Sequence, residues 1–302
     1  MERNSFLYKS RRKLQIVAHK MFSNEFMSKL YFKIVLHQKL DLKNPSTFNE
    51  KLQWLKLYYL PQNPLVTKCA DKYAVREYIK QKGYEDKLVP LLGVWDNANK
   101  IDWDNLPNKF ILKCNHGCAY NIIVKNKDTE NKKSVVKQLN KWLKEDFGAY
   151  NIELHYSNIK PRVITCERFL GENITDYKFF CFNGVPMFVY AANNLIHDRQ
   201  AQIGFFYLDG SRMPLKRDDY EDIKTVKFPS FFNEMKKMAA NLAKEFSFVR
   251  VDFFVTNNKY YFAELTFTPS ACMMPFNPSK FDYELGSKLD ISKEIKKFRN
   301  NK

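Results

Sequence analysis

The stretch VRVDFFVTNNKYYFAELTFTP, residues 249–269, is typical of two β-strands joined by a short turn. Alternate residues of a strand lie on one face of a sheet, so Arg250 and Asp252 share a face of the first strand. Glu264 and Thr266 likewise share a face of the second strand, and the opposite faces are apolar. Two carboxylates with a hydroxyl nearby are hard oxygen ligands of the kind that Mg²⁺ takes beside nucleotide phosphates. The residues alone fit two interpretations, a metal site or a surface hairpin with an ordinary Arg250 ion pair.

The turn of this hairpin decides whether the two carboxylates meet. A two-residue turn at Asn257-Asn258 is favoured locally, because Asn tolerates positive φ. It would place Asp252 opposite Ala263 and would turn Glu264 to the other face of the sheet. A shared metal site needs a three-residue loop or a bulge that restores the parity. We expect one of these two devices, with both carboxylates on one face.

The order of predicted elements outside this hairpin favours an α+β fold. Asn183-Gly184, within DYKFFCFNGVPMFVYAA, is the strongest turn signal in the chain and predicts a second hairpin. Thr47 and Glu50 fit the capping box that opens a helix in FNEKLQWLKLYY. NEMKKMAANLAKEF has the apolar spacing of another helix. Because the strands are mostly joined as hairpins, regular βαβ alternation is not expected.

The chain of 302 residues is strongly basic, with 50 Lys+Arg against 33 Asp+Glu and a net charge of +17. Part of the excess lies at the ends, in residues 1–20 and in the tail SKEIKKFRNNK. These ends are either solvated or in peripheral contact with an anionic membrane. The sequence contains no apolar run long enough for a membrane span and no signal-peptide pattern. We therefore expect a cytoplasmic protein, with the inner face of the membrane as its peripheral partner.

The cysteines and the missing motifs exclude several classes of protein. The six cysteines form no C-x-x-C pair, and we expect all of them to be reduced, buried thiols. The P-loop motif, the G-x-G-x-x-G motif and H-E-x-x-H are all absent, so a P-loop NTPase, a simple Rossmann enzyme and a zincin are not expected.

Several motifs, taken in order, resemble the ATP-grasp superfamily. They are FNEKLQWLKLYY, KCNHG, CERFL, DYKFFCFNG and VRVDFF…ELTFTP, and they are most similar to the TupA-like branch found in bacterial capsule, teichuronopeptide and exopolysaccharide loci. The resemblance covers roughly residues 35–285. It implies an ATP-grasp fold, in which two α+β lobes clasp ATP. The implied division is a mainly helical region over residues 1–105, a small lobe over residues 106–170 and a large lobe over residues 171–302.

The resemblance also implies roles for individual residues, with ATP and two Mg²⁺ ions as cofactors. Arg250 would hold the tetrahedral intermediate, and Lys178 would face the transferred phosphate. Lys113 would contact the α- and β-phosphates, and the loop Asn115–Tyr120 would be a mobile phosphate lid. Glu167 would begin the adenine hinge. The implied cofactor-binding residues are Lys113, Asn115, His116, Gly117, Glu167, Phe169, Leu170 and Asp176, and the implied metal ligands are Asp252, Glu264 and Thr266.

This sequence departs from the family pattern at two places. Thr266 stands where the third metal ligand is usually Asn, although a hydroxyl can still ligate a metal. The lid is poor in glycine, because Cys118 and Ala119 occupy positions where glycine would ease the approach of the backbone to phosphate. The resemblance gives His116 no firm role.

The implied activity is that of an ATP-dependent carboxylate–amine ligase that acts through an acyl phosphate. It would join an amino acid or amine to a uronic-acid sugar of a surface polysaccharide, and the basic charge suits such an acidic partner. A sugar or small-molecule kinase of the same fold is an alternative. A glycosyltransferase is another, because Asp102-Trp103-Asp104 forms a D-x-D, although this motif is more typical of a surface turn. Charge alone supports nucleic-acid binding, and we expect none.

Overall fold

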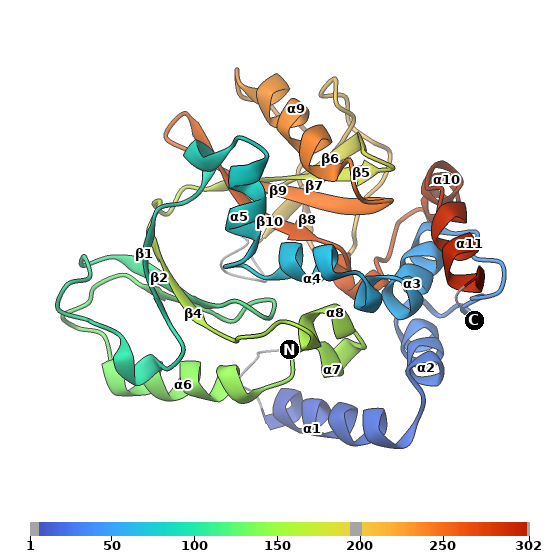
Figure 1. Ribbon diagram of the computed structural model, residues 1–302. Helices are drawn as coiled ribbons and strands as arrows, with labels where there is room; N and C mark the ends of the chain where they lie inside the picture. The colour runs from blue at the N-terminus through green and yellow to red at the C-terminus, as the bar shows by residue number, and fades with distance from the viewer. Residues whose placement is uncertain (1–5, 194–200, 301–302) are drawn as a thin grey trace.

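The computed structural model describes residues 6–193 and 201–300, so the first five and last two residues of the basic ends lie outside it. The chain forms two β-sheets with helices around them, which confirms the predicted α+β class (Figure 1). Within the described part, no helix is both long enough and apolar enough to cross a bilayer. The helices are α1 (Phe6–Met21), α2 (Asn24–Leu36), α3 (Phe48–Tyr58), α4 (Pro64–Ala70), α5 (Val75–Gln81), α6 (Lys132–Lys144), α7 (Gly148–Asn151), α8 (Leu154–Ser157), α9 (Phe232–Ala243), α10 (Lys280–Lys288) and α11 (Ser292–Asn300).

The smaller sheet has four strands in the order β1-β4-β2-β3, and all neighbours are antiparallel. The amphipathic helix α6 buries Val135 and Leu139 and runs along this sheet (Figure 1). The first strand comes from a part of the chain in which the sequence pattern predicted mainly helices. The strands are β1 (Leu91–Trp95), β2 (Phe110–Cys114), β3 (Asn121–Val124) and β4 (Ile164–Arg168).

The larger sheet has six strands in the order β10-β9-β5-β6-β7-β8. Its neighbours are antiparallel except for the short pair β7 and β8, which is parallel. The hairpin between β5 and β6 turns at Asn183 and Gly184, both with positive φ, as the sequence predicts. The strands are β5 (Thr175–Phe182), β6 (Val185–Asn193), β7 (Gln202–Phe206), β8 (Glu221–Asp222), β9 (Phe248–Thr256) and β10 (Lys259–Thr266).

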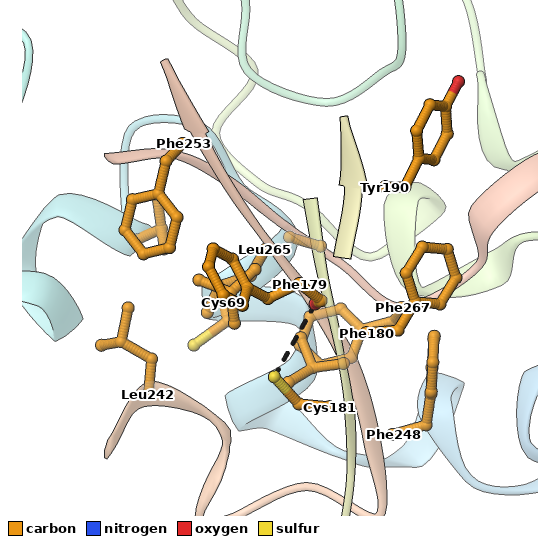
Figure 2. Close-up of a cluster of buried hydrophobic side chains, with 14 of the residues drawn as sticks. Cys69, Phe179, Phe180, Cys181, Tyr190, Leu242, Phe248, Phe253, Leu265 and Phe267 are labelled. Carbon is orange, nitrogen blue, oxygen red and sulfur yellow. Dashed lines mark hydrogen bonds between the residues drawn. The ribbon is translucent and has the colours of Figure 1, made fainter. Parts of the chain in front are cut away.

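The two faces of β5 meet different helices, and this alternation builds the core (Figure 2). Phe179 packs against Phe232 of α9, with ring centroids 5.2 Å apart and the rings tilted, and the Cys181 thiol lies on the same face. Phe180 and Phe182 point the other way, toward Phe48 of α3. Helix α3 is held at its start by the predicted capping box, in which the side chains of both box residues are bonded to backbone N–H groups. The face of β5 that carries Phe180 and Phe182 also carries Asp176 and Lys178, near the start of the strand.

The hairpin of β9 and β10 combines the short turn with a bulge. Asn257 and Asn258 form a two-residue turn with positive φ, and the three-residue loop is not used. The pairing then shifts between Phe262 and Glu264, so that Glu264 lies opposite Asp252. The extra residue of the bulge is Ala263, which restores the parity that the turn alone would break. The expectation that both carboxylates share one face is confirmed.

The cysteines follow the sequence analysis with one exception. All six are free thiols, and five of them are buried. Cys118 is exposed, so the expectation that every cysteine is buried is wrong for this residue. It lies in the loop that follows β2.

Candidate active site

A cleft of about 1310 Å³ opens between the smaller sheet, the β9–β10 hairpin and the N-terminal helix. The loop after β2 supplies Cys118, Ala119 and Tyr120 to its wall. Arg250, Glu264 and Thr266 of the hairpin also line it, together with residues of the turn that follows β10. The cleft therefore brings together the predicted phosphate loop and the predicted metal-binding hairpin. Further lining residues come from α1 and from the segment around α7 and α8, among them Ser10, Arg12, Ile16, Tyr150, Glu153 and Tyr156.

A row of charged side chains crosses β5, β9 and β10 beneath the cleft. Lys178 Nζ lies 2.9 Å from Asp252 Oδ2 and 3.2 Å from Asp176 Oδ1. Asp252 is fully buried, and both of its oxygens accept hydrogen bonds from cations. Burial acts to lower the pKa of Lys178, but Asp176 and Asp252 outweigh it and raise the pKa, so the lysine stays charged. We call this set the charged row; its members are Asp176, Lys178, Arg250, Asp252, Glu264 and Thr266.

Arg250 joins the two carboxylates that the sequence paired. Its guanidinium donates to both oxygens of Asp252, at 2.7 and 2.6 Å, in the bidentate geometry that favours arginine over lysine. The same Nη2 atom lies 3.3 Å from Glu264 Oε1 and 3.1 Å from Thr266 Oγ1. Three predicted metal ligands therefore converge on one cationic nitrogen. The ion pair of the alternative interpretation is present, but it lies at the base of the cleft.

Glu264 is the carboxylate of the row that reaches the cleft. A third of its side chain is exposed, whereas that of Asp252 is fully buried. Burial alone would raise the pKa of Glu264, but nearby cations, first Lys72 and then Arg250, lower it to about 2. Glu264 also accepts a hydrogen bond of 3.0 Å from Thr266 Oγ1. It is therefore an ionised carboxylate that faces the cleft at neutral pH.

The donor set fits Mg²⁺ in the way that nucleotide-dependent enzymes hold it. Among residues 6–193 and 201–300, no group of three or more His, Cys, Asp or Glu side chains forms a metal cage. Mg²⁺ does not need one, because it is usually bound through one or two carboxylates together with substrate phosphates and water. Glu264 and Thr266 would supply the protein oxygens at the cleft, with Asp252 behind them. For Asp252 to ligate the ion, the guanidinium of Arg250 would have to move.

Lys113 faces the larger sheet from the end of β2. Its Nζ lies 2.5 Å from Glu167 Oε2 on β4 and 5.8 Å from the ring centroid of Phe254 on β9. Arg76 approaches the other oxygen of Glu167, at 3.6 Å. The two cations leave Glu167 with a compensated charge between the sheets. Phe169 and Leu170 follow Glu167 and are half-buried, as an adenine hinge would require.

The loop Asn115–Tyr120 is packed at its start and open at its end. Asn115 is buried and bonds to Asp71 and to the backbone of residue 163. His116 is buried beneath α6, where its Nε2 lies 3.1 Å from the Trp142 carbonyl. Gly117 has no room for a Cβ atom, which would lie within 3.0 Å of neighbouring aromatic rings. These three predicted cofactor-binding residues do not line the cleft, whereas Cys118, Ala119 and Tyr120 of the same loop do.

Ala119 takes the conformation that glycine would normally supply. Its φ is 57°, in the left-handed region that a side chain with a Cβ atom disfavours. The loop thus keeps a glycine-like bend despite its sequence, and its backbone turns toward the cleft at the residue where the family pattern is broken. Strain of this kind is concentrated at binding and catalytic sites.

A TupA-like ATP-grasp family model matches residues 50–290 of this chain, which is most of its length. The chain belongs to the TupA-like ATP-grasp family. The resemblance drawn from the motifs is confirmed, and the two sheets with the cleft between them are those of an ATP-grasp fold. No curated protein gives a significant match.

Solved structures of ATP-grasp ligases are similar to this chain at low identity. D-Alanine–D-alanine ligase from Bacillus anthracis is 13% identical with a TM-score of 0.47, and the alignment covers 78% of this chain and 71% of that one. The Helicobacter pylori enzyme is 18% identical with a TM-score of 0.45 and coverages of 82% and 70%. N5-carboxyaminoimidazole synthetase from Staphylococcus aureus is 15% identical with a TM-score of 0.40 and coverages of 71% and 50%.

The ATP-grasp site contains cations that the sequence analysis missed. Lys72 Nζ donates to the Gly117 carbonyl at 2.7 Å and lies 4.0 Å from Glu264 Oε2. It therefore links the predicted phosphate loop after β2 to the charged row of the larger sheet. Arg76, one turn farther along, reaches Glu167. The sequence showed both residues only as part of a helical segment, and no local signal directs them to the cleft.

The FNEKLQWLKLYY motif of this ATP-grasp chain supports the far wall of the cleft. Lys56 is buried and its Nζ donates to the Asn151 carbonyl at 3.0 Å and lies 3.5 Å from the Ala271 carbonyl. Gln53 donates to the carbonyls of Ala271 and Cys272. These two side chains of α3 hold the turn after β10. Three successive residues of that turn, Ser270, Ala271 and Cys272, have positive φ.

Proposed function

We propose that the protein is an ATP-dependent carboxylate–amine ligase that works through an acyl phosphate. The observation that carries the proposal is the charged row: Asp252 lies opposite Glu264, and Arg250 connects them at the base of the cleft. Family membership supports the use of ATP, because the cleft lies where the two lobes of an ATP-grasp fold meet. The predicted site residues remain part of this proposal.

In this proposal, some cations of the site bind ATP and others stabilise charge that develops during the reaction. Lys113 and Lys72 lie on the side of the phosphate loop, where fixed positive charges would neutralise ATP. Arg250 and Lys178 lie in the charged row, where charge develops as the γ-phosphoryl group moves to the substrate carboxylate and ADP leaves. The amine then attacks the acyl carbon, the amide bond forms and phosphate departs. Preorganised donors stabilise such charge at little reorganisation cost.

Mg²⁺, two ions in this proposal, would neutralise charge on the ATP phosphates and so favour transfer of the phosphoryl group. Glu264 and Thr266 would hold it at the cleft wall. Glu264 is ionised over the physiological range, since its pKa is about 2, so it needs no deprotonation to accept a cation.

The acid substrate of the proposal is a uronic-acid sugar of a surface polysaccharide precursor, and the amine is an amino acid or a small amine. The support is membership of the TupA-like branch together with the net charge of +17, which attracts acidic substrates. We place the enzyme in the cytoplasm, in peripheral contact with the inner face of the membrane. The nucleic-acid alternative gains no support from any side-chain arrangement within the described residues.

The test is ADP release from the purified protein over a matrix of uronic-acid sugars and amines, with the product analysed by mass spectrometry. The proposal predicts ADP only when acid and amine are both present, and a product heavier than the acid by the amine less water. ADP formed with a sugar alone, together with a phosphorylated sugar, would favour the kinase. Thermal stabilisation by a UDP-sugar and not by ATP would favour the glycosyltransferase. Against the latter, Asp102 and Asp104 lie exposed in a surface turn.

A further inference from the structure

Helices α1 and α2 expose a run of large apolar side chains that nothing in the described part of the chain covers. On α1, Leu14, Val17 and Met21 are spaced i, i+3 and i+7, which places them on one face of the helix. Leu14 and Met21 are 70% and 71% exposed. Isolated exposed apolar residues are ordinary, but a continuous run of them marks a surface that binds a membrane or another protein.

The run continues across the corner between the two helices and along α2. Phe22 follows Met21 directly, and its ring stacks on that of Phe26 with centroids 5.0 Å apart. Leu30 and Ile34 follow Phe26 at steps of four residues, so they extend the same side of α2. We call this surface the apolar corner; its residues are Leu14, Val17, Met21, Phe22, Phe26, Leu30 and Ile34.

Positive charge surrounds the apolar corner. Lys20 is exposed beside Met21, and Lys33 is exposed on α2 next to the apolar residues. Lys29 is exposed there too, but its Nζ lies 2.7 Å from Glu25 Oε1, so part of its charge is neutralised. The basic helix α11 is attached to the same region, because Phe298 packs against Tyr58, whose hydroxyl donates to Glu25 of α2. Its Lys293, Lys296, Lys297 and Arg299 are exposed.

The opposite face of α1 belongs to the cleft. Arg12 and Ile16 line the cleft, and at 100° per residue they point away from the face of Leu14 and Val17. Arg12 Nη1 lies 3.4 Å from the Tyr120 hydroxyl of the phosphate loop, and the guanidinium lies 3.9 Å from the ring centroid of Tyr150. One face of helix α1 therefore forms part of the apolar corner, and its opposite face lines the cleft.

We propose that the apolar corner docks on an anionic membrane surface, and that docking holds the cleft beside an acceptor sugar carried on lipid. Apolar residues with flanking lysines are the composition of helices that lie in the membrane interface. Charge complementarity favours anionic lipid over a protein partner, because the lysines lie on both helices and on α11 rather than at one spot. The docking surface itself is independent of the ligase reaction, whereas the lipid-carried acceptor rests on the proposed function.

The test is co-sedimentation of the purified chain with vesicles of phosphatidylcholine alone and of phosphatidylcholine mixed with phosphatidylglycerol. The V17D/F26D variant should lose binding to the mixed vesicles by about tenfold or more, because two apolar contacts become charged. The matched control is Val185→Asp, an equally exposed apolar residue at the start of β6. It should bind like the unaltered chain. Salt at about 1 M, where the Debye length is only ~3 Å, should also release the protein.

Several outcomes would overturn the proposal. Equal binding to both kinds of vesicle would contradict the proposed attraction to anionic lipid. Equal loss of binding in V17D/F26D and Val185→Asp would show that the apolar corner is not the docking surface. A chain that is dimeric in solution and becomes monomeric in V17D/F26D, without binding vesicles, would make the corner a self-association surface. Glu264→Gln separates the two proposals, because it should keep vesicle binding whether or not the ligase proposal is correct. Thermal melting of each variant checks that the exposed substitutions leave the fold intact.

Discussion

Two buried lysines near the cleft have opposite surroundings. Lys56 of α3 faces carbonyl oxygens, and burial lowers its pKa. Lys178 of β5 faces two carboxylates, which outweigh burial and raise its pKa. A carbonyl oxygen accepts the hydrogen bond but does little to stabilise the protonated lysine, whereas a carboxylate stabilises the protonated lysine by its negative charge. The comparison indicates that Lys56 is a structural anchor, and it supports the proposed role of Lys178 as a fixed charge in the reaction.

The sharpest way to break this comparison is Lys178→Met. It leaves Asp176 and Asp252 buried without their shared cation, and losing one partner of a buried pair costs about 3–5 kcal/mol. We expect that loss in the free energy of unfolding, measured by denaturant titration, together with loss of ADP release. Lys178→Arg keeps the charge and should recover most of the stability. Full stability in Lys178→Met would mean that the carboxylates do not depend on this lysine.

Arg250→Ala tests whether charge in the row serves the reaction rather than ATP binding. The guanidinium is assigned to charge that develops during phosphoryl transfer, so kcat should fall by about 10²–10³-fold while KM for ATP changes little. Steady-state ADP release at varied ATP separates the two constants. Arg250→Lys serves as the charge-keeping control, and it should fall short of the unaltered enzyme because lysine cannot bond Asp252 at two points. A rise in KM alone would contradict the assignment.

The wall around Lys56 should show its own pH dependence through His155. This imidazole is fully buried, and burial, with Lys56 nearby, lowers its pKa from 6.5 to about 3. As pH falls below 6.5, the unfolded chain binds a proton that the folded chain does not, so stability decreases until the pH approaches 3. Between pH 6.5 and 4 the loss from His155 should be roughly 3 kcal/mol, and His155→Leu should remove this part, while buried His116, whose pKa is lowered to about 4, keeps its own contribution.

Glu264→Gln provides the control for that pH range. The folded pKa of Glu264 is about 2 and its ordinary value is 4.5, so its contribution to stability is complete above pH 4.5 and is lost as pH falls toward 2. The variant should therefore leave the slope between pH 6.5 and about 5 unchanged. An equal change of slope in both variants would show that the acid sensitivity does not come from the histidine.

Lys56→Met should have the smallest effect. It leaves the Asn151 carbonyl without this donor, while Gln53 still donates to Ala271, and an unsatisfied buried acceptor costs about 1–3 kcal/mol. Thermal unfolding should report that loss, while kcat at saturating substrates stays near the unaltered value. A fall in kcat as large as that of Arg250→Ala would remove the distinction between the two lysines.

The sequence predicted those features that depend on neighbours along the chain. The capping box at Thr47, the turn at Asn183-Gly184 and the charged faces of β9 and β10 all follow from local chemistry or from alternation along a strand. The resemblance to a family added the role of Lys113 and the division into lobes, which the residues alone could not supply. The predicted division into three regions remains an expectation.

The features that the sequence analysis missed depend on packing between distant segments. Lys72 reaches Glu264 only because the turn before α5 packs against the loop after β2, and Lys56 reaches Ala271 only because α3 lies under the turn after β10. A lysine in a helical segment gives no sign of such a partner. The bulge at Ala263 also has no sequence signal, since alanine is common both in bulges and in regularly paired strand positions.

That bulge also limits how the hairpin can assemble. On the turn side of Ala263, the pairing follows one offset, from Thr256 with Lys259 to Phe253 with Phe262. Beyond it, the pairing of Asp252 with Glu264 follows an offset one residue larger. If the two strands paired without the bulge, only one half of the hairpin could keep its native partners. In the other half, the apolar residues would turn to the face that carries the charges. Misaligned pairings therefore bury less apolar surface than the native pairing, so the bulge favours the register that brings Asp252 opposite Glu264.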